Sequence, residues 1–471
     1  MRRERHKLLV VGLDALSPEK LFREWREELP TFSSLAAQGV WGRLESCHPP
    51  ITVPAWSCVF TGRDPGELGC YGFRTRTSYS YGTYDLASSR SVPFPRVWDR
   101  LGRRGFRSLL VGVPQTYPAP EIRGEVVSCF LTPPGGPRWT FPASLAEEVS
   151  GRFGSYRFDV EGFRSAEYPR ILREVYEKTR KDFDLVRYLC ATRRWDLCVF
   201  VEIAVDRLQH AFWAFCDPGS DRFDPEGSFR WVLRDYYRFL DEEMAKLLEV
   251  VGPDTSVLVL SDHGARRMEG GVCLNDWLAA RGLLRLRETP RGATEFRPEL
   301  VDWRRTVAWA DGGYCGRVYL NVRGREPCGY VARTEYERVR SEVAAALREL
   351  ETAEGGRLET SVHTPEELYR TVRGPAPDLL AYFGDLGWRV IGSVGHGTFR
   401  IRENDRGPDG ANHDWFGSWV YRPCTSTLGG REIEGWALEA IHRLILSEFG
   451  LEENPLGGSE AGDREPPSLH P

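Results

Sequence analysis

The sequence contains little lysine and no excess of positive charge. Only five of its 63 basic residues are lysines, and the formal net charge is -5. A chain with this balance has no general attraction to the phosphates of nucleic acid or to anionic lipid. We therefore expect no nucleic-acid polymer as its partner.

Long apolar runs and paired cysteines are also missing. No stretch approaches the roughly 20 apolar residues that a transmembrane helix requires. The first apolar run, LLVVGL, meets Asp14 before it reaches the length of a signal-peptide core. The 11 cysteines are odd in number and form no CxxC pair, which is typical of reduced thiols. These absences predict a cytoplasmic protein without a membrane span.

The chain has the length and composition of a large folded protein. Its 471 residues exceed the limit of about 250 to 300 residues for a single core, so we expect two domains or one large sheet domain with insertions. Hydrophobic residues make up 41% of the sequence, which is enough for a substantial core.

Short, continuously apolar runs alternate with helical or irregular segments. The runs are KLLVVGL, SLLVGVP, DLCVFVEIA and SVLVLSDHG. Such runs are typical of buried parallel strands, and their alternation with helices predicts an α/β fold with a doubly wound sheet. Ligands bind at the carboxyl ends of the strands in such sheets. Asp14, Asp206 and Asp262 all stand at or just after these ends.

The rest of the chain adds segments around this sheet. We expect a catalytic domain over residues 1 to 451, with a helical insertion at about 141 to 190 that covers the site. Residues from about 265 to 390 mix helical and strand-like stretches, and form either a second lobe or an elaboration of the same sheet. Residues 452 to 471 lack periodicity and are expected to be a disordered tail.

Several potential metal ligands lie at strand ends or in loops. Each has a second interpretation, because a strand-end Asp often caps a helix and a polar pair often lies on a solvated helix face. Asp and His residues that converge from separate segments instead fit a pair of divalent cations, most naturally zinc, with manganese and magnesium as alternatives. The residues concerned are Asp14, Asp206 with His210 four residues later, Asp262 with His263, and His413 in a Gly-rich passage.

Thr52 is the candidate nucleophile. It precedes a Pro-containing turn and an expected helix at 55 to 60, so it also suits the role of a helix N-cap. A threonine hydroxyl becomes a good nucleophile only when a cation or a base helps to remove its proton. The neighbouring ligand motifs favour the catalytic role.

Taken in order, these motifs resemble a known family. GLDAL with Asp14, PTFSSLAAQGV, TVPAW with Thr52 and FTGRDPGELG resemble the opening of the type I phosphodiesterase/nucleotide pyrophosphatase family of the alkaline phosphatase superfamily. DRLQH, SDHGARR, LNDWL, RVYLN and ANHD follow in the same order. The resemblance extends over about residues 7 to 445.

The resemblance implies an alkaline phosphatase-like, three-layer α/β/α sandwich with a two-metal site and a small phosphate-ester substrate. Thr52 would attack phosphorus in line and form a phosphothreonine that water then hydrolyses. By its matching positions, His413 is preferred over His396 as the last ligand. One ion would be bound by Asp14, Thr52, Asp262 and His263, and the other by Asp206, His210 and His413.

One departure bears on the substrate. Nucleotide pyrophosphatases of this family use an Asn about twenty residues after the nucleophile, whereas residues 69 to 80 contain none. Arg74 or Arg76 would be a substitute as an anion contact, although we expect both to be solvated surface residues.

Other activities remain as alternatives. A phosphomonoesterase or a phosphonate hydrolase would use the same residues, whereas a sulfatase or a phosphoglycerate mutase would not present Thr at position 52. A lipid or glycan transferase is disfavoured because a membrane span is missing. A non-catalytic binding protein with the same fold would leave clustered carboxylates without a compensating cation.

Overall fold

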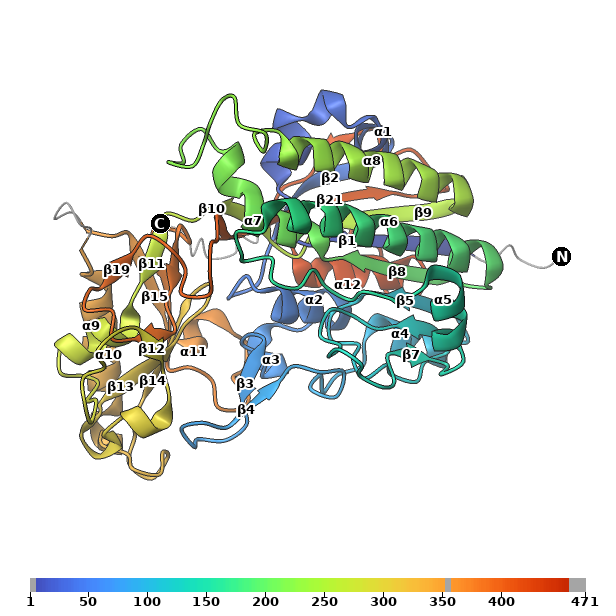
Figure 1. Cartoon of the computed structure of the whole chain (residues 1–471). Helices are drawn as coiled ribbons and strands as arrows, with labels where there is room; N and C mark the ends of the chain where they lie inside the picture. The colour runs from blue at the N-terminus through green and yellow to red at the C-terminus, as the bar shows by residue number, and fades with distance from the viewer. Residues whose placement is uncertain (1–5, 352–356, 457–471) are drawn as a thin grey trace.

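A ten-stranded sheet forms the centre of the molecule (Figure 1). The computed structural model describes residues 6–351 and 357–456. The strands of this sheet follow the order β22 (Arg431–Glu432), β2 (Val40–Glu45), β21 (Phe416–Arg422), β9 (Thr255–Leu260), β1 (Lys7–Leu13), β8 (Leu197–Glu202), β5 (Ser108–Val111), β6 (Gly124–Val127) and β7 (Thr140–Phe141), and β23 (Trp436–Ala437) pairs with β2.

The middle of this sheet is parallel and its outer strands are mixed. β1 pairs in parallel with both β8 and β9, and β5 pairs in parallel with β8 and β6. β21 and β7 run antiparallel to their neighbours. The residues of β8 and β9 are all buried, as expected for strands covered on both faces.

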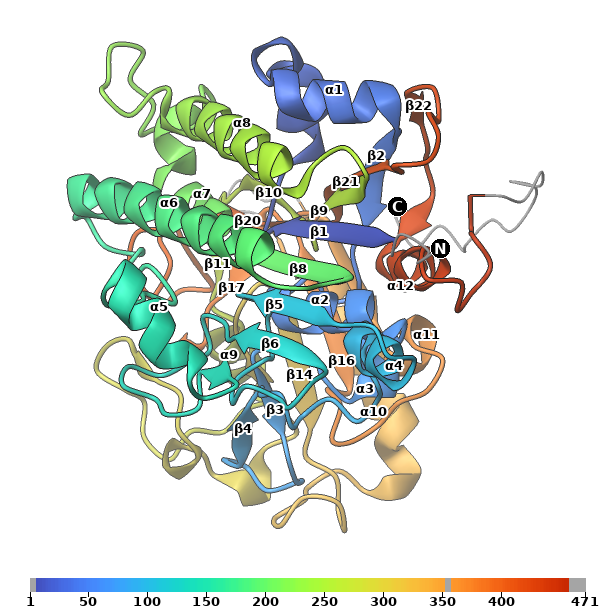
Figure 2. The same ribbon diagram turned by 90° about the vertical axis from the view of Figure 1, so that its right-hand side faces the viewer.

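Helices cover both faces of the sheet (Figure 2). One core lies between the sheet and a layer that contains α1 (Pro30–Gln38), α6 (Tyr168–Thr192), α7 (Ala204–Cys216) and α8 (Val232–Val251). The opposite core is formed with α2 (Thr52–Thr61), α4 (Val97–Arg103) and α12 (Leu438–Ser447). The sheet and its two helical layers give the three-layer α/β/α arrangement that the sequence predicts.

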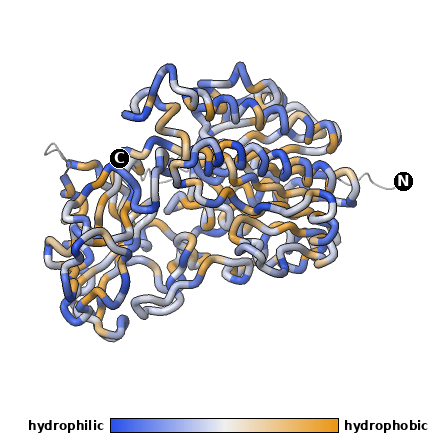
Figure 3. Tube along the Cα trace, viewed as in Figure 1, coloured by the Kyte–Doolittle hydropathy of each residue, from blue (hydrophilic) through white to orange (hydrophobic). Residues whose placement is uncertain are grey.

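Residues between β10 (Gly264–Arg267) and β20 (Ala411–Asp414) build a second sheet with its own core. Both sheets contain segments of hydrophobic residues, which are orange in Figure 3. The strands formed by residues 265 to 390 therefore lie outside the central sheet. The strands of the second sheet are β13 (Ala308–Asp311), β14 (Gly316–Leu320), β16 (Leu379–Phe383), β17 (Trp388–Val390), β11 (Gly270–Val272) and β19 (Arg400–Ile401), with β15 (Thr360–His363) beside β16; α9 (Leu274–Ala280) and α10 (Tyr336–Arg348) pack on it.

Smaller elements complete the fold. They are the pairs β3 (Arg74–Arg76) with β4 (Tyr84–Leu86), β12 (Thr294–Glu295) with β18 (Ser393–Val394), and β10 (Gly264–Arg267) with β20 (Ala411–Asp414), and the short helices α3 (Pro65–Leu68) and α11 (Pro365–Leu368).

The helical insertion at 141 to 190 contains α5 (Leu145–Phe153) and α6. Both helices contribute to the core on one face of the central sheet. The part of the insertion that reaches the site is the loop between them, through Phe163 and Arg164. The sequence pattern located the helices but not this loop contact, because loop residues carry no periodicity.

The C-terminal tail, a membrane span and the state of the thiols were also subjects of prediction. Most of the tail at 452 to 471 lies outside the described residues, which end at 456. Within the described part of the chain, no helix has the length and apolar character needed to cross a bilayer. All eleven cysteines lie in that part, and each is a free thiol.

Candidate two-metal active site

Three buried carboxylates meet at the carboxyl ends of adjacent strands. Asp14 follows β1, Asp262 follows β9, and Asp206 lies in the first turn of α7, which begins after β8. These strands are neighbours and run in parallel, so their carboxyl ends lie at the same edge of the sheet. All three residues are at most 1% exposed.

Thr52 is the first residue of α2 and faces these carboxylates. Its Oγ1 lies 3.5 Å from Asp14 Oδ1 and 3.3 Å from His263 Nε2. The N-cap of α2 is Ile51, and no side chain caps this helix among the described residues. The hydroxyl therefore points into the site, and the interpretation of Thr52 as a helix cap does not describe its position.

A short antiparallel ladder brings His413 to the same place. β10 pairs with β20 so that Ala265 stands opposite His413. Since Asp262 and His263 directly precede β10, the ladder places both segments side by side. The rings of His263 and His413 stack with centroids 3.7 Å apart.

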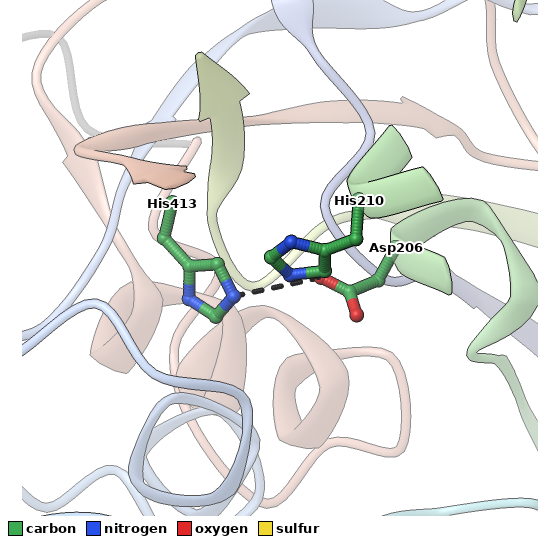
Figure 4. A group of neighbouring side chains, drawn as sticks. All are labelled: Asp206, His210 and His413. Carbon is green, nitrogen blue, oxygen red and sulfur yellow. Dashed lines mark ion pairs between the residues drawn. The ribbon is translucent and has the colours of Figure 1, made fainter. Parts of the chain in front are cut away.

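The predicted ligands form two groups. Asp14, Asp262 and His263 offer donor atoms that all lie within 4.8 Å of one another, and so do Asp206, His210 and His413. Figure 4 shows the second group, in which both imidazole rings approach the carboxylate of Asp206. The Asp206 Oδ1 atom lies 3.3 Å from His210 Nε2 and 3.5 Å from His413 Nε2. The structure thus brings together every predicted site residue.

Hydrogen bonds fix the tautomer of each histidine. The Nδ1 atom of His263 donates to the carbonyl of Gly264 at 2.9 Å, and that of His413 donates to the carbonyl of Pro50 at 2.7 Å. His210 Nδ1 lies 2.7 Å from a carboxylate oxygen of Asp409. A neutral imidazole that donates from Nδ1 presents a lone pair at Nε2. All three Nε2 atoms therefore face the site as potential metal ligands.

Burial and neighbouring charges shift the pKa values of the site residues. Burial, followed by repulsion from Asp206, raises the pKa of Asp14 well above its usual value. Burial and the charge of Asp14 raise the pKa of Asp262 in the same way. Burial lowers the pKa of His263 to about 4, so this ring stays neutral. Bound cations would relieve the repulsion among these carboxylates.

Two buried atoms support the same assignment. Among the described residues, Asp262 Oδ2 and His413 Nε2 have no hydrogen-bond partner. Buried polar atoms without partners are rare in folded proteins unless an ion or water satisfies them. Oxygen and imidazole nitrogen donors also suit zinc and related divalent cations. The residues present therefore fit two divalent metal ions.

Sequence reasoning did not identify the residues that surround His210. Asp409 accepts from His210 Nδ1, and Arg164 Nε donates to Asp409 at 2.5 Å. Tyr314 places its hydroxyl 3.3 Å from His210 Nε2 and stacks on His413 with centroids 3.4 Å apart. Asp409 lies only four residues before His413, which was a usable signal, whereas Arg164 and Tyr314 come from distant segments without a motif.

A pocket of about 560 Å³ adjoins this site. Its wall contains six arginines and three acidic residues, so cationic side chains predominate there, and seven aromatic residues also line it. Arg164 and Tyr314 belong both to this wall and to the surroundings of His210. Its six arginines are Arg74, Arg164, Arg207, Arg317, Arg389 and Arg406.

The two arginines that we expected at the surface, Arg74 and Arg76, differ in their exposure. Arg74 is exposed and lines the pocket, so it is available to a bound anion. Arg76 is only 3% exposed, and its Nη2 atom lies 3.6 Å from Glu326, which corrects the surface assignment. Burial is possible because the guanidinium is paired and lies over the rings of Trp309 and Tyr319.

Comparisons with known proteins agree with this geometry. The family model described as "Type I phosphodiesterase / nucleotide pyrophosphatase" matches residues 8–414. No curated protein matches the sequence.

Solved structures share the fold at low identity. Human ectonucleotide pyrophosphatase/phosphodiesterase 5 is similar with a TM-score of 0.55, 11% identity and 94% of each chain covered. An inactive form of the murine protein, in complex with AMP, is similar with a TM-score of 0.54 and 12% identity, and 96% of each chain is covered. Phosphonoacetate hydrolase from Sinorhizobium meliloti, in complex with phosphonoacetate, is similar with a TM-score of 0.60 and 14% identity. The match covers 94% of this chain and 96% of the hydrolase chain. The alkaline phosphatase-like fold is therefore confirmed.

Proposed function

Since the chain belongs to the type I phosphodiesterase/nucleotide pyrophosphatase family, a family of phosphoric-ester hydrolases, we propose that it is a metal-dependent phosphodiesterase with Thr52 as nucleophile. Two divalent metal ions, most naturally zinc, would be held by the two ligand groups. One ion would bind Asp14, Thr52, Asp262 and His263. The other would bind Asp206, His210 and His413.

The observation that carries this proposal is the convergence of the Thr52 hydroxyl with three buried carboxylates and the Nε2 atoms of three imidazoles. Bound cations would favour loss of the hydroxyl proton and neutralise charge on the transferring phosphoryl group. Asp14 and His263 lie at the Thr52 hydroxyl and hold it toward the centre. Thr52 also begins a ten-residue helix, whose amino terminus favours an anionic phosphate.

The chemical step follows from these positions. Thr52 Oγ1 forms a bond to phosphorus, the ester oxygen leaves with its electron pair, and the hydroxyl proton is lost to solvent or to the leaving group. Water then attacks the phosphothreonine and releases Thr52 and the phosphate product. Each half-reaction breaks one phosphorus–oxygen bond and forms one, so the enzyme returns to its starting state.

The pocket indicates an anionic substrate with an apolar or aromatic part. Its arginines suit oxygen anions, and its aromatic residues offer faces for packing. The stretch that lacks the expected Asn contributes Gly72, Phe73 and Arg74 to this wall. We therefore propose phosphodiesters as the substrate class and do not restrict it to nucleotides.

A phosphonate hydrolase is the second candidate. Arg74 occupies the stretch that carries an Asn in nucleotide pyrophosphatases, and the excess of arginines fits a substrate with a second anionic group. Phosphonoacetate, with its carboxylate, is one compound of this kind.

Hydrolysis of model substrates tests the proposal. We would compare bis-p-nitrophenyl phosphate, p-nitrophenyl phosphate and phosphonoacetate with metal-loaded wild type, Thr52→Ala and Thr61→Ala, and quantify bound metal in each. Thr61 ends the same helix and donates to the backbone of Ser57, so it controls for the loss of a buried threonine hydroxyl.

We expect diester turnover that disappears in Thr52→Ala, persists in Thr61→Ala and leaves metal bound in all three proteins. Turnover of phosphonoacetate alone would favour the second candidate. Full activity of Thr52→Ala would refute Thr52 as the nucleophile.

A further inference from the structure

A third group of metal-ligand side chains lies outside the two-metal site. It comprises Cys273, Asp276 and His396, whose donor atoms all lie within 4.8 Å of one another. Cys273 precedes α9, Asp276 lies in the first turn of that helix, and His396 follows β18. His396, the alternative to His413 among the potential ligands, belongs to this other group.

Asp276 is held in one orientation by the loop that carries His396. Its Oδ1 atom accepts the backbone N–H of Gly395 at 3.0 Å and that of His396 at 3.1 Å. Metal-ligating carboxylates are commonly fixed by such surrounding hydrogen bonds. The bonds also keep the carboxylate next to the imidazole, as a shared ligand position requires.

The tautomer of His396 follows from its neighbours. Ser393 Oγ lies 2.6 Å from a carboxylate oxygen of Asp405, which accepts its hydrogen. Ser393 Oγ must therefore accept from His396 Nε2, which lies 2.7 Å away. The ring proton of neutral His396 is thus on Nε2, and Nδ1 keeps a lone pair that can bind a cation. Metal-binding histidines usually donate their other ring N–H in this way.

We propose that Cys273, Asp276 and His396 form a third metal site that binds zinc. A sulfur, a nitrogen and an oxygen donor suit zinc, whereas magnesium and calcium prefer sites made of oxygen alone. Binding would convert the Cys273 thiol to a thiolate and release its proton to solvent. Water would complete the four ligands that zinc prefers.

The site would connect α9 to one part of the pocket rim. Zinc at this position joins the start of α9 to the loop that follows β18. The same region supplies Gly392, Asp405 and Arg406 to the wall of the substrate pocket. The third ion would therefore hold the pocket rim in place without taking part in phosphoryl transfer, and this inference does not depend on the proposed reaction.

Cobalt substitution distinguishes the third site from the two-metal site. Full-length protein would be stripped of metal and titrated with Co²⁺ while the near-ultraviolet sulfur-to-cobalt charge-transfer absorption is recorded. The two-metal site offers only oxygen and nitrogen ligands, so a thiolate band reports the third site alone. Zinc should then displace cobalt and remove the band.

Three variants complete the test. We expect Cys273→Ser to abolish the band and to bind one zinc fewer per chain than wild type. His396→Ala should bind one zinc fewer although it keeps Cys273. Cys328→Ser, at a partly exposed cysteine outside the group, should retain both the band and the zinc.

Two results would overturn the proposal. One is a wild-type protein that shows no thiolate band, and the other is a band that persists in Cys273→Ser. If Cys273→Ser does not fold, Asp276→Asn provides the test of the third site. This substitution keeps the side-chain size and should weaken zinc binding at least tenfold. Loss of the band in Cys273→Ser with normal ester hydrolysis would support the third site. Loss of hydrolysis in a protein that keeps the band would concern only the two-metal centre.

Discussion

Substituting Asp409 with Asn should weaken metal binding although Asp409 is not itself a proposed ligand. In the described part of the chain, the polar partners of its carboxylate are all donors: His210 Nδ1, Arg164 Nε, Asn404 Nδ2 and the backbone N–H of Ala411, with Arg389 Nη1 3.7 Å away. An amide of the same shape replaces one acceptor by an NH₂ group, which must then face a donor. Although burial opposes ionisation, His210 and Arg164 hold the pKa of Asp409 far below its usual value, so the native group is a carboxylate.

The expected loss follows from the orientation of His210. If the amide NH₂ faces this ring, His210 must move its proton to Nε2, which removes the lone pair that would bind the cation. Loss of such a supporting carboxylate typically weakens metal affinity about 10- to 100-fold. This corresponds to about 1.4 to 2.8 kcal/mol.

A competition titration against a chelator measures this effect. Asp241→Asn is the matched control, because Asp241 is also buried and accepts the backbone N–H groups of Thr31 and Phe32 at another place in the fold. We expect Asp409→Asn to lose affinity for one ion and to regain ester hydrolysis when metal is in excess. Unchanged affinity in Asp409→Asn would refute the orienting role of this carboxylate.

Three further substitutions test the fold and its pH dependence. Lys178→Met leaves two buried carboxylates without their cation and should lower the free energy of unfolding by about 3 to 5 kcal/mol in urea titrations, whereas the partly exposed Lys181→Met should change it little. Gly12→Ala would place a Cβ atom 2.3 Å from Trp56 Cη2, so we expect a destabilisation of about 1 to 3 kcal/mol. Calorimetry measures this effect, and an unchanged melting temperature would contradict the close contact between Gly12 and Trp56. Burial lowers the pKa of His442 to about 4, so the free energy of unfolding should fall as pH decreases from about 6.5 to 4, by at most about 1.4 kcal/mol per pH unit. His442→Gln should reduce this pH dependence, and an identical dependence in the variant would exclude His442 as its source.

The sequence predicted the central sheet and its ligands for one physical reason. Buried parallel strands appear as continuous apolar runs, and the residues after such runs meet at one edge of the sheet. Asp14, Asp206 and Asp262 could be identified on that basis. Assignment of Thr52 depended on the neighbouring ligand motifs, because a lone threonine at this place is usually a helix cap, and the choice of His413 over His396 depended on the family resemblance.

Other parts of the site could not be predicted from local patterns. Arg164 lies in a loop and Tyr314 precedes a strand of the second sheet, so neither has a periodic signal that relates it to His210. Arg76 was assigned to the surface because arginines are usually exposed, whereas here Glu326 and aromatic rings compensate its burial. Long-range contacts of this kind depend on how the two sheets meet.

The two sheets contribute unequally to catalysis and to recognition. Most of the proposed metal ligands follow strands of the central sheet or lie in helices that begin there, whereas Trp309, Arg317 and Arg389 reach the pocket from the second sheet. Substitutions in β13, β14 or β17 can therefore alter which ester fits while the reacting atoms keep their positions. This arrangement would allow substrate preference to diverge in evolution, or to be redesigned, through one lobe of the protein alone.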